Sequence, residues 1–136
     1  MSKAIPHISK YMTTSPHTVG IDQPLTTAHR LMRDNRIRHL PVLQGGKLVG
    51  MLTERDLALI ETLKDVDPAK VTVEDAMTPT PYTVAPTAPL DEVVSTMAEH
   101  RYGSAVVVDN GHVVGVFTTV DALAAFSDLL HSRLAK

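Results

Sequence analysis

Apolar side chains recur along the chain in two patterns, and each pattern occurs twice. The helical pattern, with apolar residues three and four positions apart, predicts helices whose first turns hold Pro24 and Pro89. Asp22 and Thr87 lie close enough upstream to cap these helices. The two apolar stripes consist of Leu25, Ala28, Leu31 and Met32, and of Leu90, Val93, Val94 and Met97.

A β-hairpin is predicted after each of these helices. Gly45-Gly46 joins the first two apolar runs and Asn110-Gly111 joins the second two, and both pairs suit the positive φ of a tight turn. Because the runs are apolar without alternation, we expect strands that are buried on both faces. The predicted strands span residues 39–43, 48–52, 105–108 and 113–117.

A second helix is predicted after each hairpin, over residues 53–63 and from Thr118 to Leu130 or beyond. Pro16 and Pro81 break any helix before the first element of each half, so those elements are expected to be extended. The short extended pieces are predicted over residues 8–12, 18–19, 73–77 and 83–84.

These elements form an internal repeat, which sets the architecture. Residues 12–60 align with residues 77–125 without a gap, and 15 of the 49 aligned positions are identical. The sequence therefore predicts an α+β protein of two tandem βαββα units. We expect the units at residues 8–64 and 73–126, a linker at 65–72 and a C-terminal helical extension at 127–136.

Each hairpin ends in the pattern Gly-x-x-Thr-x-x-Asp, at residues 50–56 and 115–121. Thr followed by an acid three residues later is typical of a capping box at a helix N-terminus. The same geometry also suits a ligand, because free N–H groups and the helix dipole attract phosphate and a carboxylate can accept two hydrogen bonds from a ribose diol. A glycine before the junction would let a ligand approach the strand closely. The sequence leaves both interpretations open.

Composition narrows the classes of function. The net charge is −2, which gives no basic surface for nucleic acid. The chain has no cysteine, no signal peptide and no apolar run of the ~20 residues that span a membrane, so we expect a cytoplasmic protein that does not contact a membrane. Gly45-Gly46-Lys47 lacks the spacing of a phosphate loop, and the histidines show no metal-binding pattern. We therefore expect no catalytic residues, no metal site and no enzymatic activity.

The combination of motifs resembles the cystathionine β-synthase (CBS) domain, which occurs in pairs as a Bateman module. The resemblance covers residues 8–126. It is carried by residues 11–13, 18–19, 38–42 and 50–57 in the first half and by 76–78, 83–84, 103–107 and 115–121 in the second. It implies two units related by a pseudo-twofold axis, with clefts that commonly bind adenosine-containing ligands.

The resemblance also implies roles for individual residues. Asp56 and Asp121 would hold ribose hydroxyls, and Thr53 and Thr118 would lie near phosphate. Thr18, Val19, Thr83 and Val84 would border the base. Arg38 and His39 would contact phosphate, in either cleft because phosphate contacts in this family can come from the opposite half. The remaining candidates, Pro41 and Arg55, lie in the same motifs.

The second half departs from this pattern. Gly103-Ser104 stands where the first half has Arg38-His39, and Thr119-Val120 stands where it has Glu54-Arg55. The basic residues are thus concentrated in one half. We expect one cleft to favour phosphorylated ligands.

The expected function is reversible binding of an adenosyl ligand by a regulatory module that acts on an unknown effector protein in another chain. AMP, ADP, ATP, S-adenosylmethionine, NAD or a cyclic dinucleotide would suit, and none is required for folding. The alternatives are a ligand-free interaction or oligomerisation module, an enzyme that acts on a nucleotide, and a nucleic-acid-binding protein, which the charge balance does not favour.

A homodimer is also expected, because the second helix of each half is apolar over more than the ~100° stripe that one core needs. The broad faces comprise Leu57, Ala58, Leu59, Ile60 and Leu63, and Ala122, Leu123, Ala124, Ala125, Phe126, Leu129 and Leu130. The alternative is that residues 127–136 fold back and cover the surplus within one chain.

Overall fold

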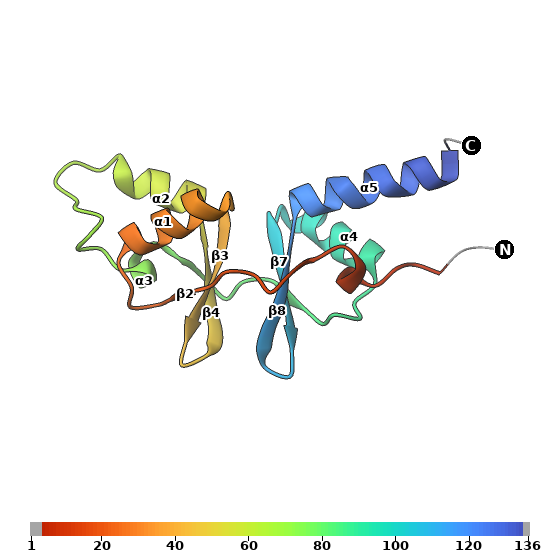
Figure 1. Ribbon diagram of the computed structural model, residues 1–136, viewed down its shortest axis with the longest axis horizontal. Helices are drawn as coiled ribbons and strands as arrows, with labels where there is room; N and C mark the ends of the chain where they lie inside the picture. The colour runs from red at the N-terminus through yellow and green to blue at the C-terminus, as the bar shows by residue number, and fades with distance from the viewer. Residues whose placement is uncertain (1–3, 135–136) are drawn as a thin grey trace. The chain divides into compact units, whose positions relative to one another are not determined.

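A computed structural model describes residues 4–134 (Figure 1). It confirms an α+β protein, with two four-stranded sheets and five α-helices in the described part of the chain. The chain divides into two compact units. The first unit spans Pro16–Pro81, and the second unit combines the residues up to Ser15 with those from Tyr82 onward.

The first unit is built on a sheet of strand order β2-β3-β4-β5, parallel between β2 and β3 and antiparallel elsewhere. Helix α1 packs its predicted stripe into the core, where Leu25, Ala28 and Met32 are at most 5% exposed. The elements are β2 (Val19–Gly20), α1 (Leu25–Asn35), β3 (His39–Gln44), β4 (Lys47–Thr53), α2 (Glu54–Glu61), α3 (Val73–Ala76) and β5 (Thr78–Pro79).

The second unit repeats this plan in the order β6-β7-β8-β1, and α4 buries Leu90, Val93 and Met97 against its sheet. Its elements are a 3₁₀ helix (Ile8–Lys10), β1 (Thr13–Thr14), β6 (Thr83–Val84), α4 (Leu90–His100), β7 (Ser104–Asp109), β8 (His112–Thr118) and α5 (Thr119–Leu134).

The hairpins confirm the predicted turns. Gly45, Gly46, Asn110 and Gly111 all have positive φ, between 52° and 81°. Both hairpins also carry the same irregularity in strand register, after Val42 and after Val107. The two halves therefore repeat in backbone detail as well as in sequence.

The outer antiparallel strand of each sheet comes from the N-terminal end of the other repeat. Strand β1 opens the first repeat and pairs with β8 of the second, while β5 opens the second repeat and pairs with β4 of the first. The chain leaves each of these strands through a residue of positive φ, Ser15 or Thr80, that is followed by a proline. The compact units are thus not the same stretches of chain as the sequence repeats.

In each sheet a glycine that lies against a methionine allows the edge strand to pair closely. A Cβ atom on Gly115 would lie 2.5 Å from Met12 Sδ and 3.1 Å from the carbonyl oxygen of Thr13. Gly50 meets Met77 and Thr78 in the same way, at 2.5 Å and 2.9 Å. Only a residue without a side chain permits the two backbones to pair so closely.

Two details of the predicted elements were wrong. Residues 8–12 and 73–77 were expected to be extended, but they begin with the 3₁₀ helix and with α3, and the extended pairs follow them. A capping box of Thr72 and Asp75 opens α3. Ile8 and Val73 are fully buried, so each short helix anchors an edge strand in a core.

The predicted caps Asp22 and Thr87 were also wrong. Pro24 and Pro89 occupy the N-cap positions of α1 and α4, and neither helix has a side-chain cap. Backbone carbonyls from neighbouring segments replace the caps, because the N–H of Leu25 donates to Val71 and that of Leu90 donates to Pro6.

Helix α5 runs without a break as far as Leu134. Residues 127–134 are therefore part of this helix and do not fold back to cover it, while Ala135 and Lys136 lie outside the described residues. Tyr11, which precedes β1, donates a hydrogen bond of 2.6 Å from its hydroxyl to Asp128 Oδ2 of α5. None of the helices described between residues 4 and 134 is long and apolar enough to cross a membrane.

We predict that Gly115→Ala lowers the free energy of unfolding by about 1–3 kcal/mol, because the new methyl group meets Met12 and the rigid carbonyl of Thr13. Urea unfolding measures the change. Gly20→Ala is the matched control, since its Cβ would meet only the movable side chains of Asp22 and Gln23. Equal effects of the two substitutions would show that the edge pairing does not need a glycine.

We also predict that the stability contributed by Tyr11 disappears at alkaline pH. The hydrogen bond to Asp128, desolvation and the carboxylate charge raise the Tyr11 pKa above its ordinary value of 10.0. A raised pKa in the folded state stabilises the protein fully below pH 10.0, and this stabilisation is lost as pH rises through the folded-state pKa. The difference in unfolding free energy between wild type and Tyr11→Phe should therefore shrink above pH 10.0. A constant difference from neutral to alkaline pH would contradict the assignment.

Candidate functional site

The first Thr-x-x-Asp motif forms a capping box where β4 turns into α2. The N–H of Thr53 donates to Asp56 Oδ2 at 2.8 Å, and the N–H of Asp56 donates to Thr53 Oγ1 at 3.2 Å. Both side chains are half-buried. The structural interpretation of the motif is therefore correct for the free protein, in which Asp56 Oδ2 accepts the hydrogen bond of the cap.

The second motif forms the same box between β8 and α5 but carries an additional contact. Asp121 Oδ2 accepts from the N–H of Thr118 at 2.9 Å and from its hydroxyl at 3.2 Å. Its other oxygen, Oδ1, accepts a long hydrogen bond of 3.4 Å from the hydroxyl of Thr13 in β1. Both oxygens of Asp121 are thus engaged within the second unit.

Thr13 is a site residue that the sequence did not point to. Its signals are the identity of Met12-Thr13 with Met77-Thr78 in the aligned repeats and its place among residues 11–13, which carry the family resemblance, and neither signal names a partner. The edge strand brings Thr13 to Asp121 from 108 positions away in the chain.

Fewer free N–H groups remain at the helix N-terminus than the sequence suggested. The N–H of Glu54 donates to the carbonyl of Arg38 at 2.9 Å, and that of Asp56 is taken by Thr53. Of the N–H groups that lack a partner within the helix, at most that of Arg55 is left for a ligand in the first unit.

The role expected for Gly50 and Gly115 was also wrong. These glycines were expected to leave room for a ligand over the strand. The space where their side chains would lie is taken by Met77 and Met12 of the edge segments.

The basic candidates of the first unit gather near its Thr-x-x-Asp junction. His39 pairs with Thr53 across the hairpin, and Arg38 forms an exposed ion pair with Glu54, with Nε 3.3 Å from Oε2. Arg55 follows in the first turn of α2 and is exposed. The side chains predicted to face phosphate therefore share one end of β3 and β4 with the carboxylate of Asp56.

The residues expected to border the base lie further along the sheet. Val19 pairs with Val42, three positions along β3 from His39, which corresponds to about 10 Å. Val19 is only 2% exposed, whereas Thr18 is half-buried. Pro41 is buried and has little surface to offer a ligand.

In the second unit no basic side chain replaces Arg38, His39 or Arg55. Ser104 pairs with Thr118, and the N–H of Thr119 donates to the carbonyl of Gly103 at 3.2 Å, so the backbone is the same as in the first unit. Thr83 is exposed and Val84 is half-buried. The two junctions share a backbone but differ in charge. No cluster of three metal-binding side chains occurs between residues 4 and 134.

Comparisons with known proteins assign the fold to a family. The model of the CBS domain matches residues 8–60 and again residues 73–128. The chain is 32% identical over 110 residues to the CBS domain-containing protein YhcV of Bacillus subtilis, an alignment that covers 81% of this chain and 78% of that protein.

Two further relatives carry names that concern ligands or reactions. Inosine-5'-monophosphate dehydrogenase of Korarchaeum cryptofilum is 33% identical over 122 residues, which cover 89% of this chain but only 24% of that enzyme. The crystal structure of the CBS domain pair of protein MJ0100, in complex with 5'-methylthioadenosine and S-adenosyl-L-methionine, has a TM-score of 0.80 and 26% identity, and the alignment covers 92% of this chain and 98% of that one.

Both repeats match the family model, and the backbone of each unit supports the match. The chain belongs to the CBS domain family, as a tandem pair of CBS domains.

Proposed function

We propose that this chain is a regulatory module that binds an adenosyl ligand reversibly and transmits the resulting change of shape to an effector protein in another chain. The observation that carries the proposal is the cluster at the first-unit junction, where the Asp56 carboxylate, the Thr53 hydroxyl and the cations of Arg38 and Arg55 lie at one end of two paired strands. The MJ0100 domain pair, a relative of similar fold, was crystallised with two adenosyl compounds.

Each part of an adenosyl ligand has a complementary group in the first unit. The second oxygen of Asp56 can accept from a ribose hydroxyl while the first oxygen keeps the cap. Arg38 and Arg55 can pair with phosphate at the positive end of the α2 dipole. The base would then extend along the sheet toward Thr18 and Val19. This charge pattern favours a phosphorylated ligand such as AMP, ADP or ATP over S-adenosylmethionine or an uncharged nucleoside.

The second unit is proposed as the weaker phosphate site. Asp121 already accepts from Thr13 and Thr118, and a ribose diol would have to compete with Thr13 for Oδ1. Gly103 and Val120 stand at the positions of Arg38 and Arg55, so these two phosphate-binding arginines have no counterpart here. We therefore expect the first adenine nucleotide to occupy the first unit.

Transmission to a partner needs no catalytic step. Ligand binding at the N-terminus of α2 would alter the Arg38–Glu54 ion pair, which joins the start of β3 to this helix. Leu59 on α2 and Leu63 just beyond its end are more than half exposed and offer contacts for a partner. The effector protein, a homodimeric state and a cytoplasmic location all remain predictions.

We predict that Asp56→Ala weakens AMP binding by about 10- to 100-fold, because a hydrogen bond to a charged group contributes about 1.5–3 kcal/mol. Isothermal titration calorimetry measures the affinity, and loss of the cap should lower stability by only about 1 kcal/mol. Asp75→Ala is the matched control, since Asp75 caps α3 in the same Thr-x-x-Asp pattern but lies at the start of another helix. If wild type binds none of AMP, ATP, S-adenosylmethionine and NAD, or if Asp56→Ala binds AMP as wild type does, the proposal fails.

We also predict that Arg38→Ala separates phosphate recognition from nucleoside recognition. Affinity for AMP should fall about 10-fold, whereas the weaker affinity for adenosine should stay the same, because only AMP pairs with the guanidinium. Arg33→Ala is the control, since Arg33 is another exposed arginine of the same unit and pairs with Asp34 on α1. An equal loss for AMP and adenosine would show that Arg38 does not contact phosphate.

A further inference from the structure

The β1 arm, residues 11–14, is held against helix α5 at two points. The Tyr11 hydroxyl donates to Asp128 Oδ2 at 2.6 Å. The Thr13 hydroxyl donates to Asp121 Oδ1 at 3.4 Å. The two carboxylates lie seven residues apart on α5, which is two turns of the helix and a rise of about 10 Å. The arm is therefore clamped along one side of this helix.

The clamp is a feature of the second unit and not of the repeat. At an offset of 65 residues, an alanine and a leucine (Ala76 and Leu63) stand where the second unit has its tyrosine and its second aspartate. The threonine is repeated as Thr78, but it makes no hydrogen bond to Asp56 in the described part of the first unit. The first unit thus has the same edge pairing without the clamp.

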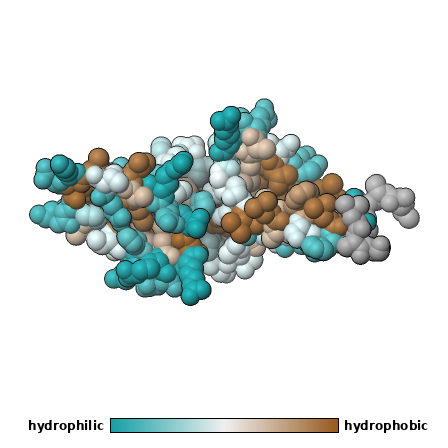
Figure 2. Space-filling model, turned by 90° about the horizontal axis from the view of Figure 1, so that it is seen from above, coloured by the Kyte–Doolittle hydropathy of each residue, from teal (hydrophilic) through white to brown (hydrophobic). Residues whose placement is uncertain are grey.

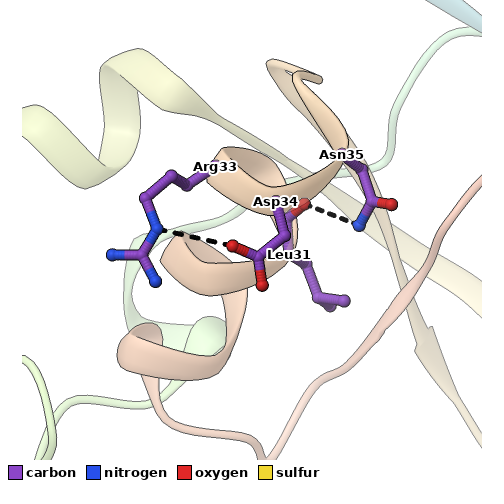
Figure 3. A network of polar contacts seen from close by, with 4 residues as sticks. All are labelled: Leu31, Arg33, Asp34 and Asn35. Atoms are coloured by element: carbon purple, nitrogen blue, oxygen red, sulfur yellow. Dashed lines mark hydrogen bonds and ion pairs between the residues drawn. The ribbon is translucent and has the colours of Figure 1, made fainter.

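Polar contacts on α1 of the first unit are local instead. Arg33 pairs with Asp34 through Nε at 3.5 Å, and the Asn35 amide donates back to the carbonyl of Leu31 at 2.9 Å (Figure 3). These contacts join residues of one helix that are at most four positions apart. The tyrosine–aspartate bond of the clamp spans 117 positions. Only a contact of this second kind changes how two segments of the chain are held together.

One end of the clamp is the carboxylate of the second candidate ligand site. Asp121 Oδ2 already accepts from the N–H and the hydroxyl of Thr118, at 2.9 Å and 3.2 Å. A ribose diol that donates to Asp121 would therefore compete with Thr13 for Oδ1. The Thr13 bond, at 3.4 Å, is longer than the about 2.5–3.0 Å that is usual between two oxygen atoms. Thr13 is thus the donor that a ligand displaces most easily.

The β1 arm is able to open without unfolding the unit. Strand β1 contributes only Thr13 and Thr14 to the sheet, both are exposed, and Ser15 after them has a positive φ of 48°. Upstream, Ile8 is fully buried, and its N–H donates to the carbonyl of Ala88. Because the chain stays anchored there, loss of the two side-chain bonds would free the arm alone.

We propose that the β1 arm is a latch: a ligand with a vicinal diol, bound at Asp121, displaces Thr13 and loosens the arm from α5. This inference rests on the proposed function and names the step by which binding in the second unit changes the shape of the chain. Coupling between the ligand and the arm is reciprocal. The closed latch therefore also weakens the ligand, and the second unit responds only at higher ligand concentrations than the first.

Helix α5 carries the change to the surface. The clamp holds its later turns through Asp128. Leu123 and Phe126 on the same helix are 67% and 59% exposed, and hydrophobic colour gathers over this helix in Figure 2. A protein that contacts α5 would therefore sense whether the latch is closed.

The first test measures the clamp in the free protein by amide hydrogen exchange. The N–H of Ser15 donates to the carbonyl of Val114 at 3.3 Å and reports opening of the arm. Thr13→Val and Tyr11→Phe each remove one hydroxyl, so each should speed exchange at Ser15 about 3- to 10-fold. Thr14→Val is the control and should change it less than ~2-fold, because Thr14 lies in the same strand outside the clamp. Exchange that neither hydroxyl affects overturns the proposal.

The second test uses adenosine, which carries the diol without a phosphate for the arginines of the first unit. When adenosine saturates the NMR shift of Asp121, exchange at Ser15 should speed about 3- to 10-fold, and Thr13→Val should bind adenosine there more tightly by a similar factor. Thr78→Val, the matched change in the first unit, should leave adenosine affinity at Asp56 within ~2-fold. Unchanged or slower exchange at Ser15, or weaker binding by Thr13→Val, overturns the latch.

Failure of the latch is distinguishable from failure of the proposed function. If AMP shifts the signal of Asp56 but adenosine neither shifts that of Asp121 nor speeds exchange at Ser15, the latch is wrong and the proposed function stands. If no adenosyl ligand shifts either aspartate, both are overturned, whatever the exchange at Ser15 in the free protein.

Discussion

The pairing of an edge strand from one repeat with the sheet of the other is the interaction on which both units depend. Strand β1 completes the sheet of the second unit and β5 completes that of the first. Each pairing is close because a methionine fills the space beside a glycine, Met12 at Gly115 and Met77 at Gly50. Neither repeat can therefore complete its sheet from its own residues, and each core also takes a buried residue from the other repeat, Val73 in the first unit and Ile8 in the second.

The same pairing makes the two candidate sites unequal. In the second unit the edge strand β1 brings Thr13 to Asp121, and both carboxylate oxygens of Asp121 accept hydrogen bonds. In the described part of the first unit Thr78 makes no corresponding hydrogen bond to Asp56, and Arg38 and Arg55 add positive charge nearby. Duplication has thus produced one backbone with two chemistries: two arginines stand beside the carboxylate of the first junction, and Gly103 and Val120 stand at the matching positions of the second.

Local features of the sequence predicted local structure well. The stripes on α1 and α4, the positive φ of Gly45-Gly46 and Asn110-Gly111, and the capping boxes at Thr53 and Thr118 all depend on residues a few positions apart. The edge pairing could not be predicted in this way, because it joins Thr13 to Val116 and has no local pattern. For the same reason Gly50 and Gly115 were expected to leave room for a ligand, and the contact of Thr13 with Asp121 was not predicted. The position of a ligand in the first unit is a proposal, and it rests on the placement of Asp56 and Arg38 at one junction.

The central claim, that an adenine nucleotide binds first at the Asp56 junction, is tested most directly by an NMR titration of the labelled chain with AMP. Backbone amide signals report which residues sense the ligand. We predict that the signals of Thr53, Arg55 and Asp56 shift at the lowest AMP concentrations, together with those of Thr18 and Val19, and that those of Thr118 and Asp121 shift later or less. Early shifts at Thr118 and Asp121, or shifts confined to helices α4 and α5, would contradict this account.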